Sequence, residues 1–235
     1  MYIIDMILHL KSVILDLFQD LVLILTKFIS PPYCIRCQNL LPDYTVLCAP
    51  CHDTLPKIAP ATIQITPART LAVHAFTAYQ EPCDKLIHAK LSSRHIPFFQ
   101  LGTLLAAYTK TITLTHDIIV PVPLHWQRKM WRGFNQAEIL AEHVAKTSGK
   151  PVILALTRRK KTEFQSALSA VERKENVSNI FSLNTKIAPA ILSGKRILLV
   201  DDLYTTGATA ASAAHELYKL GAQSVELLVA CKVID

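Results

Sequence analysis

The chain has 235 residues and a mass of 26.2 kDa, enough for one large domain, or a medium domain with small additions, and for a core without disulfide staples. An apolar fraction of 51% and a mean hydropathy of +0.28 exclude a disordered or low-complexity chain. The formal net charge of +7 and the pI near 9.1 favour anionic partners, namely phosphates, nucleic acid or acidic membranes.

The N-terminal 30 residues hold part of the apolar excess, with 20 residues of the apolar class. Charged residues interrupt the run, which argues against a membrane-spanning helix, and nothing in it resembles a secretory cleavage site. Polar residues recur every three or four positions, which predicts an amphipathic helix over 1–30. The polar stripe of this helix carries acids rather than the Lys and Arg of membrane-surface helices, so we expect the helix to dock on the rest of the protein or on a second copy. A helix that lies on the membrane through residues 1–29 is the alternative.

Four of the six cysteines form two Cys-x2-Cys pairs that are separated by ten residues: Cys34, Cys37, Cys48 and Cys51. This spacing predicts one structural zinc ion held by four thiolates, in a module over 31–57. Two disulfides or four buried thiols are the alternatives. Without an export signal we expect a reducing, cytoplasmic compartment, which disfavours disulfides. Cys83 and Cys231 stand alone in the sequence, and Cys231 lies in an apolar run that predicts a core position.

The remaining chain, 58–235, alternates predicted strands with predicted helices. Apolar runs that predict strands cover 71–79, 118–122, 152–156, 196–200 and 225–230. Helical patterns cover 82–90, 97–109, 135–147 and 208–220, and Gly149 and Gly221 follow the last two as expected left-handed caps. This alternation predicts an α/β fold with a mostly parallel sheet flanked by helices. A proline-punctuated stretch from Pro56 to Pro67 separates this domain from the cysteine module.

A pair of acids followed by a polar turn is the main chemical signal. Asp201 and Asp202 follow the apolar run 196–200 and precede the turn Thr205, Thr206, Gly207, Ala208 and Thr209 at the start of an alanine-rich helix. Free N–H groups and hydroxyls at a helix start can hold a phosphate. Adjacent carboxylates at a strand end can hold a vicinal diol or hydrated Mg2+. Together they predict a site for a ribose 5-phosphate.

Other interpretations of this segment are weaker. A Walker-B-type metal site requires a Gly-x4-Gly-Lys-Ser/Thr loop, and a dinucleotide fold requires Gly-x-Gly-x-x-Gly, and the sequence has neither. A plain strand–turn–helix with an acidic cap leaves the Thr-Thr-Gly-x-Thr run without a reason.

The segment Asp201–Thr209 resembles the PRPP-binding motif of type I phosphoribosyltransferases, and further stretches resemble the ComF family of competence-associated, phosphoribosyltransferase-like proteins. The matching stretches, in order, are the cysteine module ending in Leu55-Pro56, Val120 to Leu124, Arg132 to Gln136, Gln165-Ser166 with Leu168, Glu172-Arg173 with Asn176, and Leu199 to Asp202. The resemblance covers residues 28–232.

The resemblance implies a type I phosphoribosyltransferase-like fold and a role for each motif. Asp201 and Asp202 would hold the ribose hydroxyls, and the turn from Thr205 to Thr209 would hold the 5-phosphate of PRPP. Pro121, Val122 and Pro123 would belong to the pyrophosphate loop, with Mg2+ on the pyrophosphate. Arg158 and Arg159 would act with the acids in catalysis, as part of a basic hood that reaches Arg173.

The region 128–174 is strongly basic, with eleven Lys or Arg and four Glu, a net charge of +7. Such a region can neutralise a pyrophosphate leaving group or clamp a nucleic-acid backbone, and a solvated surface is the plain alternative. The candidate nucleic-acid residues are Arg128, Lys129, Trp131, Arg132, Arg158, Arg159, Lys160 and Lys161. Trp126, Trp131 and Phe134 are aromatic residues able to stack bases or to pack in the core.

Two function classes therefore stay open. The first is a phosphoribosyltransferase, in which a nitrogen nucleophile displaces pyrophosphate from C1 of the ribose. The second is a non-catalytic adaptor that binds single-stranded DNA with the same fold, because fold alone does not decide function. In both, the resemblance points to natural transformation at the inner face of the membrane, with other competence proteins as partners.

Overall fold

The computed structural model describes residues 32–42, 45–88, 96–159 and 180–234. Contacts within the chain divide it into two units, Met1–Asp53 and Thr54–Asp235. In the first unit, Tyr33 and Leu40 form an antiparallel bridge and a short helix α2 covers Ala49–Asp53. The predicted helix over 1–30 lies outside the described residues, so the division into 1–30, 31–57 and 58–235 stays a prediction.

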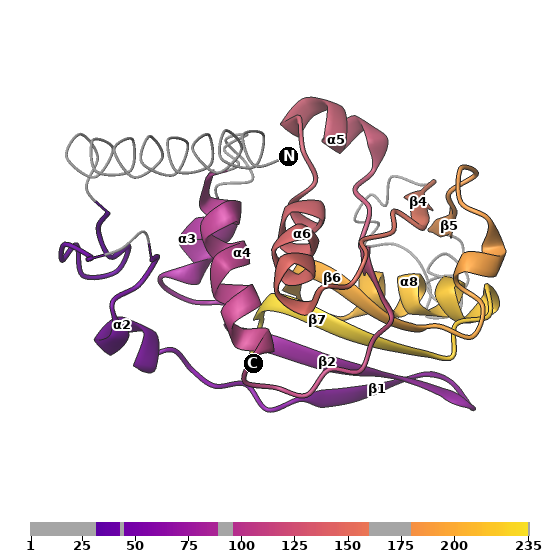
Figure 1. Cartoon of the computed structure of the whole chain (residues 1–235), viewed down its shortest axis with the longest axis horizontal. Coiled ribbons are helices and arrows are strands. Elements are labelled where there is room, and N and C mark those ends of the chain that lie inside the picture. The colour runs from indigo at the N-terminus through magenta and orange to yellow at the C-terminus, as the bar shows by residue number, and fades with distance from the viewer. Residues whose placement is uncertain (1–31, 43–44, 89–95, 160–179, 235) are drawn as a thin grey trace, which may run out of the picture. The chain divides into compact units, whose positions relative to one another are not determined.

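The second unit is built on a five-stranded sheet with the order β1-β2-β7-β6-β3 (Figure 1). Its strands are β1 (Ala61–Thr66), β2 (Arg69–Ala78), β3 (Ile118–Pro121), β6 (Arg196–Tyr204) and β7 (Ser224–Lys232). Only β1 pairs antiparallel; the pairs β2–β7, β7–β6 and β6–β3 are parallel. The sequence-based prediction of a mostly parallel sheet is thus confirmed.

Helices cover both faces of this sheet. The helices of the second unit are α3 (Cys83–His88), α4 (Ile96–Thr109), α5 (Trp126–Arg132), α6 (Gln136–Ser148) and α8 (Ala208–Lys219), of which α5 lies away from the sheet. Helices α4 and α6 pack against each other, and α6 lies on β3 and β6 (Figure 1). Helix α8 lies on the other face. Its Ala213 and Leu217 share a core cluster with Leu199 of β6 and Leu227 of β7. Successive side chains of a strand point to opposite faces, so these two leucines lie on the face that α8 covers. Both faces of these strands are therefore buried, which explains their continuous apolar runs.

The smaller elements are an antiparallel pair, β4 (Leu156–Arg158) with β5 (Phe181–Leu183), and a short 3-10 helix η2 (Pro189–Ile191). An ion pair joins the starts of β3 and β6: Arg196 Nη2 lies 2.7 Å from Asp117 Oδ1, and the Arg196 N–H donates to Asp117 Oδ2 at 2.9 Å. Among the described residues, no helix is both long and apolar enough to cross a membrane.

Three expectations about the strands were wrong in detail. The proline-punctuated stretch contains strand β1, whose alternating burial places it at the sheet edge. The run 152–156 contributes only a single bridge, from Val152 to Ile119, and the start of β4. Strand β6 continues past residue 200 to Tyr204, because β7 pairs with it as far as Lys232.

Candidate functional site

The loop between β6 and α8 has the conformation that the sequence predicts. Thr205 and Thr206 are exposed and non-helical, and α8 begins only at Ala208. Gly207 has φ +78°, and a Cβ there would lie 2.8 Å from Cζ of Tyr204. Only glycine meets both requirements without strain or overlap. The loop is therefore an open, glycine-dependent turn before a twelve-residue helix, which is the geometry of an anion-binding loop.

A pocket lies beside this loop, at the carboxyl end of β6. Its polar lining comes from the strand, the loop and the first turn of α8, and its apolar floor from β7: Asp201, Leu203, Tyr204, Thr205, Gly207, Thr209, Ala210, Leu227 and Val229. Of the predicted PRPP-binding residues, Asp201, Thr205, Gly207 and Thr209 line this pocket, whereas Asp202, Thr206, Ala208 and Pro121–Pro123 are outside its lining.

The two acids lie within β6 rather than after it, so their side chains alternate between the faces of the strand. Asp201 lines the pocket, and its Oδ1 accepts the N–H of Asp202 at 2.9 Å. Asp202 is outside the pocket lining and acts electrostatically on Arg132 and Cys231. The acids therefore present their charges to two different groups of neighbours.

The segment after β3 is fixed by a buried side chain that the sequence analysis did not single out as a site residue. The N–H of Val122 donates to the carbonyl of Val200 at 2.9 Å. Asn135 is 2% exposed and donates from Nδ2 to the Val122 carbonyl at 3.1 Å, while its Oδ1 caps α6 through the Ala137 N–H at 3.2 Å. Its position before an apolar helical pattern was the signal available in the sequence. Asn135 thereby ties Pro121–Pro123 to the start of α6.

Three guanidinium groups, Arg128 and Arg132 from α5 and Arg158 from β4, lie near one another, and the last two are also near the acids. Burial lowers the pKa of Arg132 and of Arg158, and the charge of Arg128 lowers both further. Asp202 acts in the opposite direction on Arg132, and Asp201 does so on Arg158. Arg132 Nε is also buried without a hydrogen-bond partner among the described residues. Partly desolvated cations that crowd one another form a place where an anion is favoured.

The other predicted basic residues are used differently. Lys129 Nζ lies 2.7 Å from Glu138 Oε1, and Arg159 is exposed while its N–H donates to the Ile180 carbonyl at 2.9 Å. Trp131 is 65% exposed. Lys160 and Lys161 lie outside the described residues.

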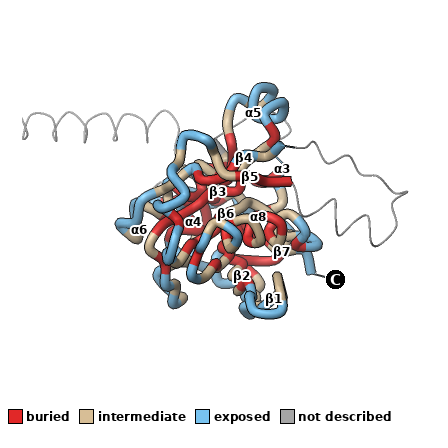
Figure 2. Tube along the Cα trace, turned by 90° about the vertical axis from the view of Figure 1, so that its right-hand side faces the viewer, coloured by how far each residue is buried: buried red, intermediate tan, exposed pale blue. Residues whose placement is uncertain are grey.

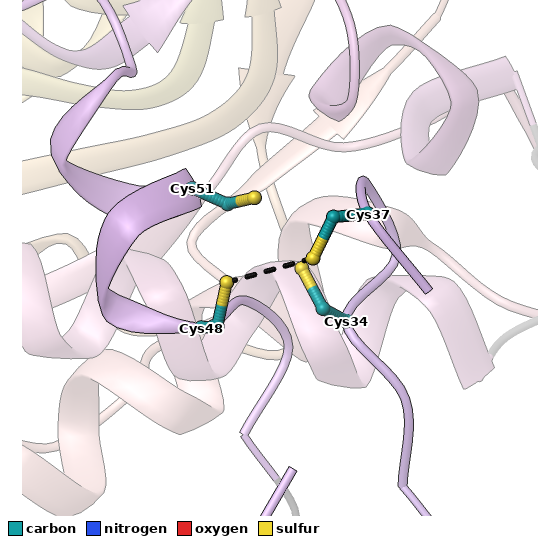
Figure 3. Close-up of side chains that lie close together, drawn as sticks. All are labelled: Cys34, Cys37, Cys48 and Cys51. Atoms are coloured by element: carbon teal, nitrogen blue, oxygen red, sulfur yellow. Dashed lines mark hydrogen bonds between the residues drawn. The ribbon is translucent and has the colours of Figure 1, made fainter. Parts of the chain in front are cut away.

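The four predicted metal ligands form one cluster (Figure 3). The sulfur atoms of Cys34, Cys37, Cys48 and Cys51 all lie within 4.8 Å of one another, and those of Cys37 and Cys48 are 3.7 Å apart. A tetrahedron with Zn–S bonds of about 2.3 Å has edges of about 3.8 Å, so the cluster can hold a metal ion of this size.

The thiols of this cluster differ in acidity. Burial raises the pKa of Cys34, but backbone N–H groups of Cys37, Cys48 and Arg36 outweigh it and lower this pKa to about 6. The hydrogen bond with Cys48, with burial, raises the pKa of Cys51 to about 12. A negative charge on one thiol disfavours ionisation of its neighbours, and a bound cation would offset that repulsion.

The remaining two cysteines, which stand alone in the sequence, lie next to each other in the structure. Cys83 and Cys231 are both fully buried, and their thiols form a hydrogen bond with each other. This contact and burial raise the pKa of Cys231 far above its ordinary value, so the thiol is protonated. The predicted core position of Cys231 is confirmed.

Comparisons with known proteins agree with this architecture. Residues 131–235 match the family described as "Phosphoribosyl transferase domain". "Competence protein F" of Haemophilus influenzae is 30% identical over 205 residues, which cover 84% of this chain and 83% of that protein. "DNA utilization protein YhgH" of Escherichia coli K12 is 34% identical over 165 residues, 66% of this chain and 70% of that protein.

Among solved structures, the glutamine phosphoribosylpyrophosphate amidotransferase of Bacillus subtilis overlaps with 56% of this chain and 25% of its own. The TM-score is 0.39 and the identity 22%, so this likeness carries no argument about function. The identity to the Haemophilus influenzae protein extends over most of both chains. The chain accordingly belongs to the competence protein F family, with a phosphoribosyltransferase-type domain.

Proposed function

We propose that the pocket beside the β6–α8 loop binds PRPP or a related ribose 5-phosphate. The observation that carries this proposal is the convergence of Asp201, Thr205, Gly207 and Thr209 on one pocket. The loop N–H groups and threonine hydroxyls would hold the 5-phosphate at the start of α8. The carboxylate of Asp201 would accept hydrogen bonds from ribose hydroxyls, and Asp202 would support it from the neighbouring position.

The pyrophosphate end of this ligand would face the three guanidiniums. Pro121–Pro123 would supply the backbone of the pyrophosphate loop, held by Asn135. Arg128, Arg132 and Arg158 would offset the pyrophosphate charge, because each lies close enough to act electrostatically on another of the three. Mg2+ bound to the pyrophosphate would neutralise part of the same charge.

In a transfer reaction, the bond between C1 of the ribose and the pyrophosphate oxygen breaks, and a nitrogen nucleophile forms the new bond to C1. Positive charge develops on the ribose, so this chain would accelerate the step by fixing both ends of the ligand and by stabilising the leaving pyrophosphate. The acids would orient the ribose, and the guanidiniums would receive the leaving group.

Calorimetric titration of the full chain with PRPP and Mg2+ tests the proposal. The variant Asp201→Ala/Asp202→Ala should lose at least about tenfold in affinity, since each hydrogen bond to a charged group contributes about 1.5–3 kcal/mol. Glu216→Gln, which removes a carboxylate far along α8 beside Lys219, is the matched control and should bind like wild type. Unchanged binding in the double variant would overturn the proposal. Pyrophosphate release with a panel of nitrogen bases then tests turnover.

We further infer a role in DNA uptake. The relatives that match most of this chain carry the names competence protein F and DNA utilization protein. Deleting the gene in its host should lower uptake of DNA, and restoring it with the Asp201→Ala/Asp202→Ala variant would show whether the pocket is required. Other competence proteins are the expected partners, in the cytoplasm.

A single-stranded DNA adaptor is the alternative function. Exposed Trp131 beside the exposed Arg128 and Lys129 favours it. The ion pair of Lys129 with Glu138, and the closeness of Arg128 to the partly buried guanidiniums of Arg132 and Arg158, favour the sugar-phosphate interpretation instead. Binding of single-stranded DNA measured against salt decides: a clamp on the phosphate backbone requires a steep loss of affinity with salt.

We propose that the metal of the cysteine cluster is zinc in a structural role, because four thiolates leave no open position for chemistry. Metal analysis of purified Cys34→Ser should show the loss of about one equivalent of zinc. Cys83→Ser, which changes a cysteine outside the cluster, is the control and should keep its metal.

A further inference from the structure

Helix α5 exposes an unusual amount of apolar surface for its length. Trp126, Met130 and Trp131 are 58%, 75% and 65% exposed, and none of its seven residues is buried. In Figure 2 the helix lies at the edge of the second unit, away from the buried sheet. Large apolar side chains grouped on a projecting element indicate a contact surface.

The helix is amphipathic, and its basic side is directed at the protein. At about 100° per residue, the three apolar side chains share one arc, with Gln127 as the polar residue within it. Arg128, Lys129 and Arg132 share the opposite arc. Lys129 pairs with Glu138 at 2.7 Å, and Arg132 is half-buried and lies within electrostatic reach of Asp202. The apolar arc therefore points away from the domain.

We propose that this outward arc inserts into the headgroup region of an anionic lipid bilayer as a short interfacial anchor. Tryptophan is enriched at the membrane–water interface, and an interfacial helix buries its apolar face by about 5–10 Å. Seven residues form a rod about 10 Å long, which suits a shallow insertion. The net charge of +7 complements anionic headgroups.

Other occupants fit this arc less well. A platform for nucleic acid needs available cations beside the stacking rings, and on α5 Lys129 is paired with Glu138 and Arg132 is half-buried. A stable interface with a second copy buries about 800 Å2 on each partner, which is more than three side chains on a two-turn helix supply. The exposed apolar side chain of Met130 at the centre of the arc favours lipid acyl chains over nucleic acid and over a second copy of the chain.

Both tryptophans of the chain lie on α5, so intrinsic tryptophan fluorescence reports on this helix alone. The experiment adds vesicles of phosphatidylglycerol and brominated phosphatidylcholine, in equal parts, to the full chain. The tryptophan emission should shift to the blue and be quenched by the bromine atoms. Vesicles of brominated phosphatidylcholine alone should shift and quench the tryptophan emission less, because they lack anionic headgroups. Quenching separates α5 from any membrane contact through residues 1–29, which contain no tryptophan.

The variant Met130→Asp should weaken the quenching response at least about tenfold, since it places a charge at the centre of the inserted face. Leu154→Asp, at another exposed apolar residue, should respond like wild type. Both variants should keep PRPP binding, if wild type has it, because neither position lines the pocket. Vesicle-bound protein whose tryptophans are not quenched would overturn the proposal. Quenching of the tryptophan emission by oligothymidylate without vesicles would overturn it as well, because α5 would then bind nucleic acid. A blue-shifted emission in the absence of vesicles would also overturn it if Met130→Asp removed the shift by dissociating a dimer.

Discussion

The substitution Gly207→Ala tests whether the β6–α8 loop is built for a ligand. Two effects act at this position. Alanine at φ +78° loses about 1–2 kcal/mol because its Cβ crowds the backbone. The same Cβ would also overlap the Tyr204 phenol, including Cζ at 2.8 Å, and a forced shift of a packed side chain costs about 1–3 kcal/mol more.

A second glycine separates these effects. Gly194 has φ +68°, and nothing lies within 4 Å of the Cβ that alanine would add. Gly194→Ala should therefore lower the free energy of unfolding by about 1–2 kcal/mol from backbone strain alone. Gly207→Ala should lower it by about 2–5 kcal/mol. Urea denaturation of both variants beside wild type measures the difference.

Ligand binding is the decisive assay. If the overlap displaces Tyr204 and the loop, at least one N–H bond to the phosphate is lost, and PRPP affinity should fall by about 10–100-fold. Gly194→Ala should bind PRPP as tightly as wild type. Folded Gly207→Ala protein with wild-type affinity would falsify the assignment of this loop as a phosphate site, and equal losses in both variants would show a global effect instead.

Three further predictions concern the surroundings of the pocket. Asn135→Ala should lower the free energy of unfolding by about 1–3 kcal/mol in urea denaturation, because it removes a buried bond and a helix cap. Asn135→Asp keeps the oxygen that caps α6 but cannot donate to the Val122 carbonyl, so this variant should retain α6 and bind PRPP more weakly. Equal PRPP affinity of Asn135→Asp and wild type would contradict the role of Asn135 in positioning the loop. Arg132→Met should weaken inorganic pyrophosphate binding in calorimetry without lowering the free energy of unfolding, because Arg132 is desolvated and its Nε is unpartnered among the described residues; a stability loss with unchanged binding would assign it a structural role. Arg196 holds the pKa of Asp117 well below its usual value through hydrogen bonds, so the stability from this pair is present above the ordinary aspartate pKa and is lost as pH falls through the folded-state pKa. The stability gap between wild type and Asp117→Asn should thus be constant near neutral pH and close in strong acid, and a gap that persists there would refute this linkage.

Local patterns were sufficient where neighbouring residues alone decide the structure. The Cys-x2-Cys pairs place two thiols on each knuckle, and the structure gathers all four sulfurs. The run Thr205–Gly207 predicts an open turn because glycine, at φ +78°, permits what other residues resist. Helices α6 and α8 begin and end within a residue or two of the ranges their periodicity predicts.

Strand ends were decided by partners distant in the sequence. The sequence placed Asp201 and Asp202 just after the strand, because acids are rare in strands, yet β7 continues to pair with β6 beyond them. That pairing turns the two carboxylates to different sides of β6. Strand β1 was hidden in a proline-rich stretch, and its edge position explains why a strand is tolerated there.

The sequence by itself determined the parallel sheet, the cysteine cluster and the open glycine turn before α8, because each depends on periodicity or spacing within a few residues. Only the tertiary structure decided which charges meet. Arg128 and Arg132 come from α5 and Arg158 from β4, and a bridge between His125 and Arg158 brings the two segments together, so that Arg132 and Arg158 come within electrostatic reach of the acids of β6. The outward direction of Trp126 and Met130 was decided in the same way, since the opposite side of α5 is occupied by those ionic contacts.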